Sequence, residues 1–140
     1  TENAVEIDVD GSYHAATKEF SYGMVVLVDG KEEKFSKKMT DPELAQMRNV
    51  AGEIKGSEAA MQYALDYKIP SIIIYHDYQG IASWCNGDWK ANKPGTIRYK
   101  KFIADRRNQI EIEFSKVAAH TGDTYNEMAD KLAKEALGII

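Results

Sequence analysis

Apolar and charged residues alternate at the start of the chain, and this alternation predicts a β-strand over residues 5–10. The segment reads VEIDVD, so its apolar side chains share one face and its carboxylates share the other. Residues 24–28 form a second, apolar strand, and Asp29-Gly30 supplies the residues that a tight hairpin turn prefers. A more polar third strand follows over residues 32–39. The pattern therefore predicts three consecutive antiparallel strands.

A helical pattern follows the third strand. Asp41-Pro42 is typical of a helix start, with Asp as the cap and Pro at the first helical position. Apolar residues then recur at helical spacing as far as residue 67. We expect one long helix over residues 42–67, and Gly52 and Gly56 mark the places where it would bend.

The second half of the chain alternates strands with helices. Residues 72–75 are apolar on both faces, which is typical of a buried parallel strand. The other predicted elements are a short helix over 79–85, a basic helix over 96–108, a strand over 110–114 and a C-terminal helix that begins at 124. This order predicts an α/β fold with a five-stranded mixed sheet, three antiparallel strands and then parallel strands, flanked by helices. No repeat or linker divides residues 1–140, so we expect a single domain.

Composition narrows the class of protein and its compartment. Hydrophobic residues make up 44% of the 140 residues, which is ordinary for a globular domain. Cys85 is the only cysteine, so no internal disulfide can form and a reducing compartment is expected. The sequence shows no apolar run as long as a membrane span and no secretion signal. These features predict a cytoplasmic protein without membrane contact.

Positive charge is concentrated in one segment, although the formal net charge is -4. Between residues 90 and 107 the only acid is Asp105. The basic residues there are Lys90, Lys93, Arg98, Lys100, Lys101, Arg106 and Arg107. Taken alone, such a run is more typical of a solvated helix face. The alternative is a local contact with phosphates.

Four acids fall at strand ends or on the edges of apolar helix faces. Asp10 and Asp77 end two predicted strands, and neighbouring strands of a sheet place their ends side by side. Glu53 and Asp130 lie at the rims of the apolar faces of two predicted helices. Each acid alone is more typical of a solvated side chain. If they converge, their mutual repulsion requires protons or cations, and all-oxygen ligation suits Mg²⁺ or Mn²⁺.

Other common catalytic patterns are missing from the sequence. One cysteine and scattered histidines do not make a zinc site of the usual type. The chain also has no glycine-rich phosphate loop with a following lysine. The acids therefore remain the strongest candidates for chemistry.

The sequence resembles the type 1 ribonuclease H family in four motifs, which occur in the family's order and span essentially the whole chain. The motifs are IDVDGS at 7–12, RNVAGE at 48–53, YHDYQ at 75–79, and VAAHTGD at 117–123 followed by NEMAD at 126–130. The family's first catalytic acid precedes Gly-Ser, so the resemblance favours Asp10 over the neighbouring Asp8.

The resemblance implies hydrolysis of the RNA strand of RNA–DNA hybrids by two Mg²⁺ ions, with Mn²⁺ as a possible substitute, leaving 5′-phosphate and 3′-hydroxyl ends. Asp10 would bridge the two ions. Asp130 would hold the ion nearer the attacking water, and Glu53 and Asp77 the other. His120 would assist proton transfer or product departure.

The resemblance also implies contacts with the hybrid. Asn49 and Gln79 match residues that touch the minor groove, where a 2′-hydroxyl separates RNA from DNA. The basic segment, with Trp84 and Trp89, matches a protruding basic handle that grips the DNA strand. The implied substrate-binding residues are Gly11, Ser12, Asn49, Gln79, Trp84, Lys90, Lys93, Lys100 and Lys101.

Several features depart from the family pattern. The segment over residues 13–21 lacks the glycine-rich run of many bacterial relatives, and Tyr78 stands where many have Ser. The handle is short. Close variants of these motifs often follow a small N-terminal hybrid-binding domain, and none is present here, which is consistent with an excised catalytic domain.

Two alternative functions remain open. One is a nuclease of the wider ribonuclease H-like superfamily that acts on DNA, and the presence of Asn49, Gln79 and His120 argues against it. The other is a non-catalytic hybrid-binding module, and the presence of all four acids argues against that. The expected partner is an RNA–DNA hybrid. No protein partner is implied, and we expect a monomer.

Overall fold

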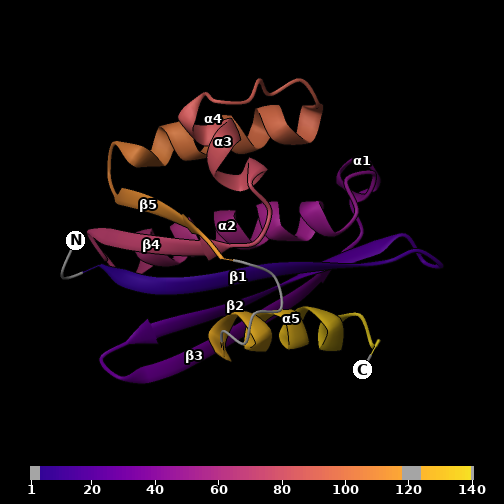
Figure 1. The fold of residues 1–140 in the computed structure, drawn as a ribbon, viewed down its shortest axis with the longest axis horizontal. Coiled ribbons are helices and arrows are strands. Elements are labelled where there is room, and N and C mark those ends of the chain that lie inside the picture. The colour runs from indigo at the N-terminus through magenta and orange to yellow at the C-terminus, as the bar shows by residue number, and fades with distance from the viewer. Residues whose placement is uncertain (1–3, 118–123, 140) are drawn as a thin grey trace.

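The computed structural model describes residues 4–117 and 124–139, which form a mixed sheet flanked by helices (Figure 1). In chain order the elements are β1 (Val5–His14), β2 (Glu19–Val28), β3 (Lys31–Met39), α1 (Pro42–Ala45), α2 (Asn49–Asp66), β4 (Ser71–His76), α3 (Gly80–Asn86), α4 (Pro94–Arg107), β5 (Glu111–Lys116) and α5 (Thr124–Ala136). Among the described residues, no helix combines the length and apolar character needed to cross a membrane.

The sheet has the strand order β3-β2-β1-β4-β5. β1, β2 and β3 pair antiparallel, whereas β4 pairs parallel with β1 on one side and with β5 on the other. The prediction of a five-stranded mixed sheet is therefore confirmed. The parallel register aligns Asp8 of β1 with Tyr75 of β4, so the residues that follow in each strand lie at the same edge of the pairing.

Helices cover both faces of the sheet. α2, α3 and α4 lie on one side, and α5 lies on the other side against β1, β2 and β3 (Figure 1). The core between α2 and the sheet is largely aliphatic, with buried aromatic residues among its members. Its central members include Ile7, Val9, Ile54, Met61, Ile72 and Ile74. The alternation of apolar residues along β1 therefore supplies the inward face that the sequence predicted.

A close backbone contact joins β1 and α2. A Cβ atom at Gly52 would overlap the carbonyl oxygen of Ser21 and come within 2.8 Å of the Cα of Gly11. A Cβ at Gly11 would in turn overlap the main chain at the start of α2. Glycine at both positions lets helix and strand touch directly. This contact brings Asp10 and Glu53, which neighbour the two glycines in sequence, close together.

The first strand is longer than predicted. β1 continues through residue 10 to His14, because residues 11–14 pair with the start of β2, from Gly11 opposite Tyr22 to His14 opposite Glu19. The prediction that Asp10 ends the strand is wrong. What ends near Asp10 is the pairing of β1 with β4, so this acid still lies beside the end of a strand, that of β4.

The predicted helix over residues 42–67 is two helices. The helical conformation is interrupted between α1 and α2, and Arg48, directly before α2, has a positive φ of 57°. Gly52 and Gly56, the positions where we expected a bend, both lie inside α2 and pack against the sheet.

Candidate active site

Three carboxylates converge from three elements of the fold. Asp10 lies within β1, Glu53 lies in the second turn of α2, and Asp77 directly follows β4. One carboxylate oxygen of each lies within 4.8 Å of those of the other two. The parallel pairing of β1 with β4 and the close contact of β1 with α2 produce this convergence. We call these three residues the carboxylate cluster.

Glu53 is held by the main chain after β4. Its Oε2 accepts a hydrogen bond from the backbone N–H of Asp77, and its Oε1 accepts one from the N–H of Tyr78, both at 2.9 Å. Burial nevertheless raises the pKa of Glu53 to about 8, and the charges of Asp10 and Asp77 act in the same direction. The two hydrogen bonds lower the pKa but do not offset burial.

Asp10 has a similar environment. Burial is the main cause that raises its pKa to about 7, and Asp130 and Asp77 add to the increase. A hydrogen bond of 2.8 Å from the N–H of Gly11 acts in the opposite direction. Two neighbouring acids with raised pKa values favour the binding of a proton or a cation between them.

Asp130 joins the cluster from the opposite face of the sheet. It lies on α5, and its carboxylate is near enough to that of Asp10 for the two to share a proton, which raises the pKa of Asp10. Its Oδ2 also lies 2.9 Å from the Nζ of Lys134, one helical turn further along α5. The structure therefore places all four predicted acids together, and a lysine partly neutralises the fourth.

A small pocket of about 150 Å³ opens at the cluster and is lined by Asp10, Asn49, Val50, Glu53, Asp77 and Tyr78. Oxygen-rich acidic linings of this kind fit hard divalent cations such as Mg²⁺ or Mn²⁺. The raised pKa values of Asp10 and Glu53 mean that added positive charge would stabilise both carboxylates. The donor set therefore fits the divalent ions that the sequence implied.

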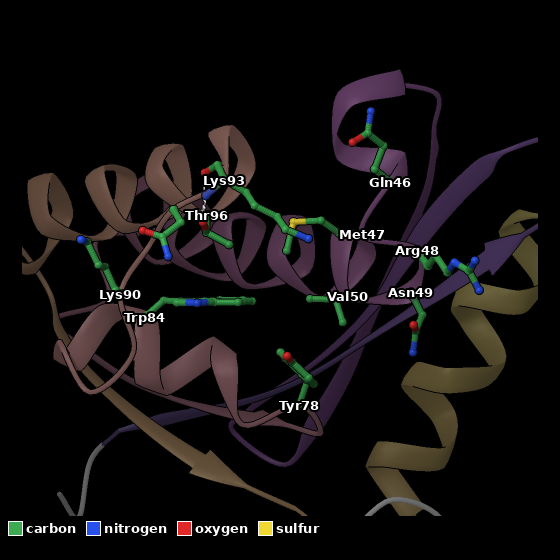
Figure 2. Close-up of a pocket in the computed structure, with 11 residues that line it drawn as sticks. Gln46, Met47, Arg48, Asn49, Val50, Tyr78, Trp84, Lys90, Lys93 and Thr96 are labelled. Atoms are coloured by element: carbon green, nitrogen blue, oxygen red, sulfur yellow. Dashed lines mark hydrogen bonds between the residues drawn. The ribbon is translucent and has the colours of Figure 1, made fainter.

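A second, larger pocket of about 380 Å³ adjoins the first (Figure 2). Asn49, Val50 and Tyr78 line both pockets. The other residues that line it are Gln46, Met47, Arg48, Trp84, Lys90, Asn92, Lys93 and Thr96. We call it the basic pocket, because three cationic side chains line it, whereas acids line the carboxylate pocket.

Several predicted substrate-binding residues lie outside both pockets. Gln79 is the residue directly before α3, and its amide donates a hydrogen bond to the Oγ of Ser83 at 2.9 Å. Lys100 and Lys101 are exposed on α4. Neither lysine lines the carboxylate pocket or the basic pocket.

The structure describes the predicted substrate-binding residues of the first motif but not the predicted catalytic histidine. Gly11 and Ser12 are buried within β1, and Gly11 lies under the first turn of α2. His120 lies outside the described residues.

Sequence reasoning did not select several residues that line the pockets, and Arg48 and Tyr78 are the two with the largest polar or aromatic side chains among them. Arg48 lines the basic pocket, and nothing in its sequence surroundings signals the positive φ that orients it. Tyr78 lines both pockets, and its one signal was the departure from Ser at that position. The departure from the family pattern at Tyr78, next to the candidate metal ligand Asp77, thus indicated a residue that lines the site.

Comparison with known proteins identifies the family. The model of the RNase H family matches residues 2–138. The chain belongs to the RNase H family. Its likeness to the Ribonuclease H of Chromobacterium violaceum extends over 98% of this chain and 97% of that protein at 27% identity. The Ribonuclease H of Wolbachia pipientis wMel is 35% identical over 65 residues, which span 41% of this chain and less than half, 45%, of that relative.

Solved structures agree with this assignment at the level of the fold. RNase H1 from the halophilic archaeon Halobacterium salinarum NRC-1 superposes with a TM-score of 0.81 at 23% identity, over 98% of this chain and 99% of that one. LC11-RNase H1, solved in complex with an RNA/DNA hybrid, gives a TM-score of 0.74 at 15% identity, over 95% and 99% of the two chains. The mixed sheet and its helices are thus those of the RNase H1 fold.

Proposed function

We propose that this protein is a divalent-metal-dependent endonuclease that hydrolyses the RNA strand of RNA–DNA hybrids. The observation that carries the proposal is the carboxylate cluster, three acids whose carboxylate oxygens lie within 4.8 Å of one another in a pocket that adjoins the basic pocket. Membership of the RNase H family supports the same activity. The solved complex of LC11-RNase H1 with an RNA/DNA hybrid supports the choice of substrate.

Each acid has a role consistent with its position. Asp10 lies between Asp130 on one side and Asp77 on the other, and both neighbours raise its pKa. This central position suits a carboxylate shared by two ions. Asp130 would then complete the site of one ion, and Glu53 and Asp77 would complete the other. Divalent ions bound there supply the charge that activates a water molecule and stabilises the leaving 3′-oxygen.

The chain's own groups would orient the substrate around this cluster. Asn49 lines both pockets, so its amide lies at the boundary between the carboxylates and the cations. An amide there can bond a 2′-hydroxyl or base edge in the hybrid's minor groove. Lys90 and Lys93 line the basic pocket and suit a neighbouring phosphate. Hydrolysis in this arrangement would leave 5′-phosphate and 3′-hydroxyl ends, with His120 assisting proton transfer.

A cleavage assay tests the function directly. The protein is incubated with an end-labelled RNA–DNA hybrid, single-stranded RNA or double-stranded DNA, each with Mg²⁺, Mn²⁺ or EDTA. We expect cuts only in the RNA of the hybrid and only with a divalent ion. Cleavage of double-stranded DNA in preference to the hybrid would indicate a DNA nuclease of the same superfamily. Hybrid binding without any cleavage would indicate a binding module.

A further inference from the structure

Three aromatic rings form a connected surface next to the carboxylate cluster. The ring centroids of Tyr78 and Trp84 are 5.7 Å apart, those of Tyr78 and Trp89 are 5.9 Å apart, and those of the two tryptophans are 6.0 Å apart. Trp84 is buried, whereas Tyr78 and Trp89 are each 40% exposed. Trp84 therefore forms the buried base of this surface, and Tyr78 and Trp89 form its exposed part.

Tyr78 is the member of this surface nearest to the acids. It lines both the carboxylate pocket and the basic pocket, and its backbone N–H holds the Oε1 of Glu53 at 2.9 Å. In Figure 2 the Tyr78 side chain lies between Trp84 on one side and Asn49 on the other. A ligand held by the carboxylates and extending into the basic pocket would therefore pass Tyr78.

The local structure keeps the Tyr78 ring in place. The carbonyl of Tyr78 accepts a hydrogen bond from the N–H of Ile81 at 3.1 Å and lies 2.9 Å from the Nδ1 of His76. α3 begins at Gly80, where a Cβ atom would overlap the Tyr78 ring and come within 2.9 Å of the Trp84 ring. Glycine at this position thus leaves the space that the two rings occupy.

We propose that Tyr78 is a direct substrate contact, whose ring packs against the sugar or base of the nucleotide next to the phosphate held by the carboxylate cluster. This inference rests on the proposed function. The described side chains that line the carboxylate pocket are three acids, Asn49, Val50 and Tyr78. The acids repel phosphates until cations are bound, so the Tyr78 ring is the one large surface there that attracts a nucleotide by stacking.

Fluorescence gives a direct binding test. The chain has only two tryptophans, Trp84 and Trp89, and the rings of both lie next to the Tyr78 ring, so tryptophan emission reports on this surface. An RNA–DNA hybrid is titrated into protein carrying Asp10→Asn, which prevents cleavage during the measurement. We expect the emission to change on binding. Adding Tyr78→Ser should weaken hybrid affinity by about tenfold, and adding Tyr78→Phe by less than about twofold.

Controls separate a ring contact from a structural effect. Tyr67→Ser removes a tyrosine that is 64% exposed at the end of α2 away from the pockets, and it should leave affinity unchanged. Tyr78→Leu keeps apolar bulk without an aromatic face and is used if Tyr78→Ser does not fold. Gly80→Ala crowds the ring, so it should weaken binding more in the parent than in the Tyr78→Ser background.

Kinetics of the cleaving enzyme complete the test. With Asp10 intact, Tyr78→Ser should raise KM for the hybrid by about tenfold and alter the distribution of cut positions, while Tyr78→Phe restores both. Equal affinity of the Tyr78→Ser and parent proteins for the hybrid would overturn the inference even if cleavage is normal. An enzyme that cuts no hybrid refutes the proposed function instead, whereas the binding titration still decides the role of Tyr78.

Discussion

At the scale of single residues, the proposed chemistry depends on acids that are costly to bring together. Asp10 and Glu53 are almost fully buried, and their pKa values rise to about 7 and about 8. Two backbone hydrogen bonds hold Glu53, and one holds Asp10. The protein therefore holds these carboxylates where burial disfavours their charged form and favours the binding of protons or cations.

Asp10→Asn tests the centre of the cluster. The substitution keeps the size of the side chain but removes the charge that would face both ions, so cleavage of a hybrid should fall by orders of magnitude. Hybrid binding should stay the same or improve, because repulsion of the phosphates decreases. Asp8→Asn, two residues earlier on the same strand, is the matched control. If Asp8→Asn abolished cleavage and Asp10→Asn did not, the assignment of the first ligand would be wrong.

The raised pKa values predict how stability depends on pH. Asp10 and Glu53 have ordinary values of 3.8 and 4.5, so between about pH 4 and about pH 8 the folded protein binds protons that the unfolded chain has released. Without metal, the free energy of unfolding should therefore fall as pH rises through this window, by at most about 1.4 kcal/mol per pH unit for each group.

A divalent ion should replace those protons. Mg²⁺ should raise the melting temperature at pH 8 and have little effect at pH 5, where protons already occupy the carboxylates. Thermal unfolding with MgCl₂ or EDTA at both pH values measures this difference. The double variant Asp10→Asn with Glu53→Gln should show a weaker dependence on both pH and Mg²⁺. Equal stabilisation at the two pH values would show that the ion binds elsewhere.

At the scale of helices and strands, periodicity predicted the elements but not their exact ends. Alternation identified β1 and helical spacing identified α2, because the apolar residues that face the core recur with the period of each element. No such pattern predicted the interruption between α1 and α2. α1 packs against α4 through Leu44, which fills the space at Gly95, and through an ion pair of 2.8 Å between Glu43 and Arg98. These interactions join segments about fifty residues apart, so local patterns do not reveal them.

The break itself carries a measurable strain. Arg48 has a φ of 57°, a conformation that residues other than glycine rarely adopt, and such strain costs on the order of 1–3 kcal/mol. Arg48→Gly should relieve this strain and so raise the free energy of unfolding. The greater conformational entropy of glycine in the unfolded chain offsets part of that gain. We therefore expect Arg48→Gly to be about 1 kcal/mol more stable than Arg48→Ala in urea unfolding. Both variants lack the cation, so equal stability would show that the backbone at this position is unstrained.

At the scale of the whole molecule, the fold sorts charge into two adjoining pockets. The sequence predicted the acids, and the structure brings Asp10 and Asp77 together because the parallel pairing of β1 with β4 places Asp10 beside the end of β4. The basic segment was harder to predict, since a run of charges does not show which members face the site. Lys90 and Lys93 line the basic pocket, whereas Lys100 and Lys101 lie exposed on α4 outside it.

This division sharpens the prediction for the basic segment. Each lysine that rests on a phosphate releases counterions, so log affinity falls with log salt in proportion to the number of neutralised phosphates. Replacing Lys90 and Lys93 with Gln should raise KM and flatten the salt slope by about one unit for each phosphate no longer neutralised, with little change in turnover at saturating hybrid. Replacing Lys100 and Lys101 is the charge-matched comparison and should have a smaller effect, unless the hybrid extends along α4. Titrations at several salt concentrations measure both slopes. If neither slope changes, the whole segment is a solvated helix face, and Asn49 and the aromatic rings must supply the grip on the substrate.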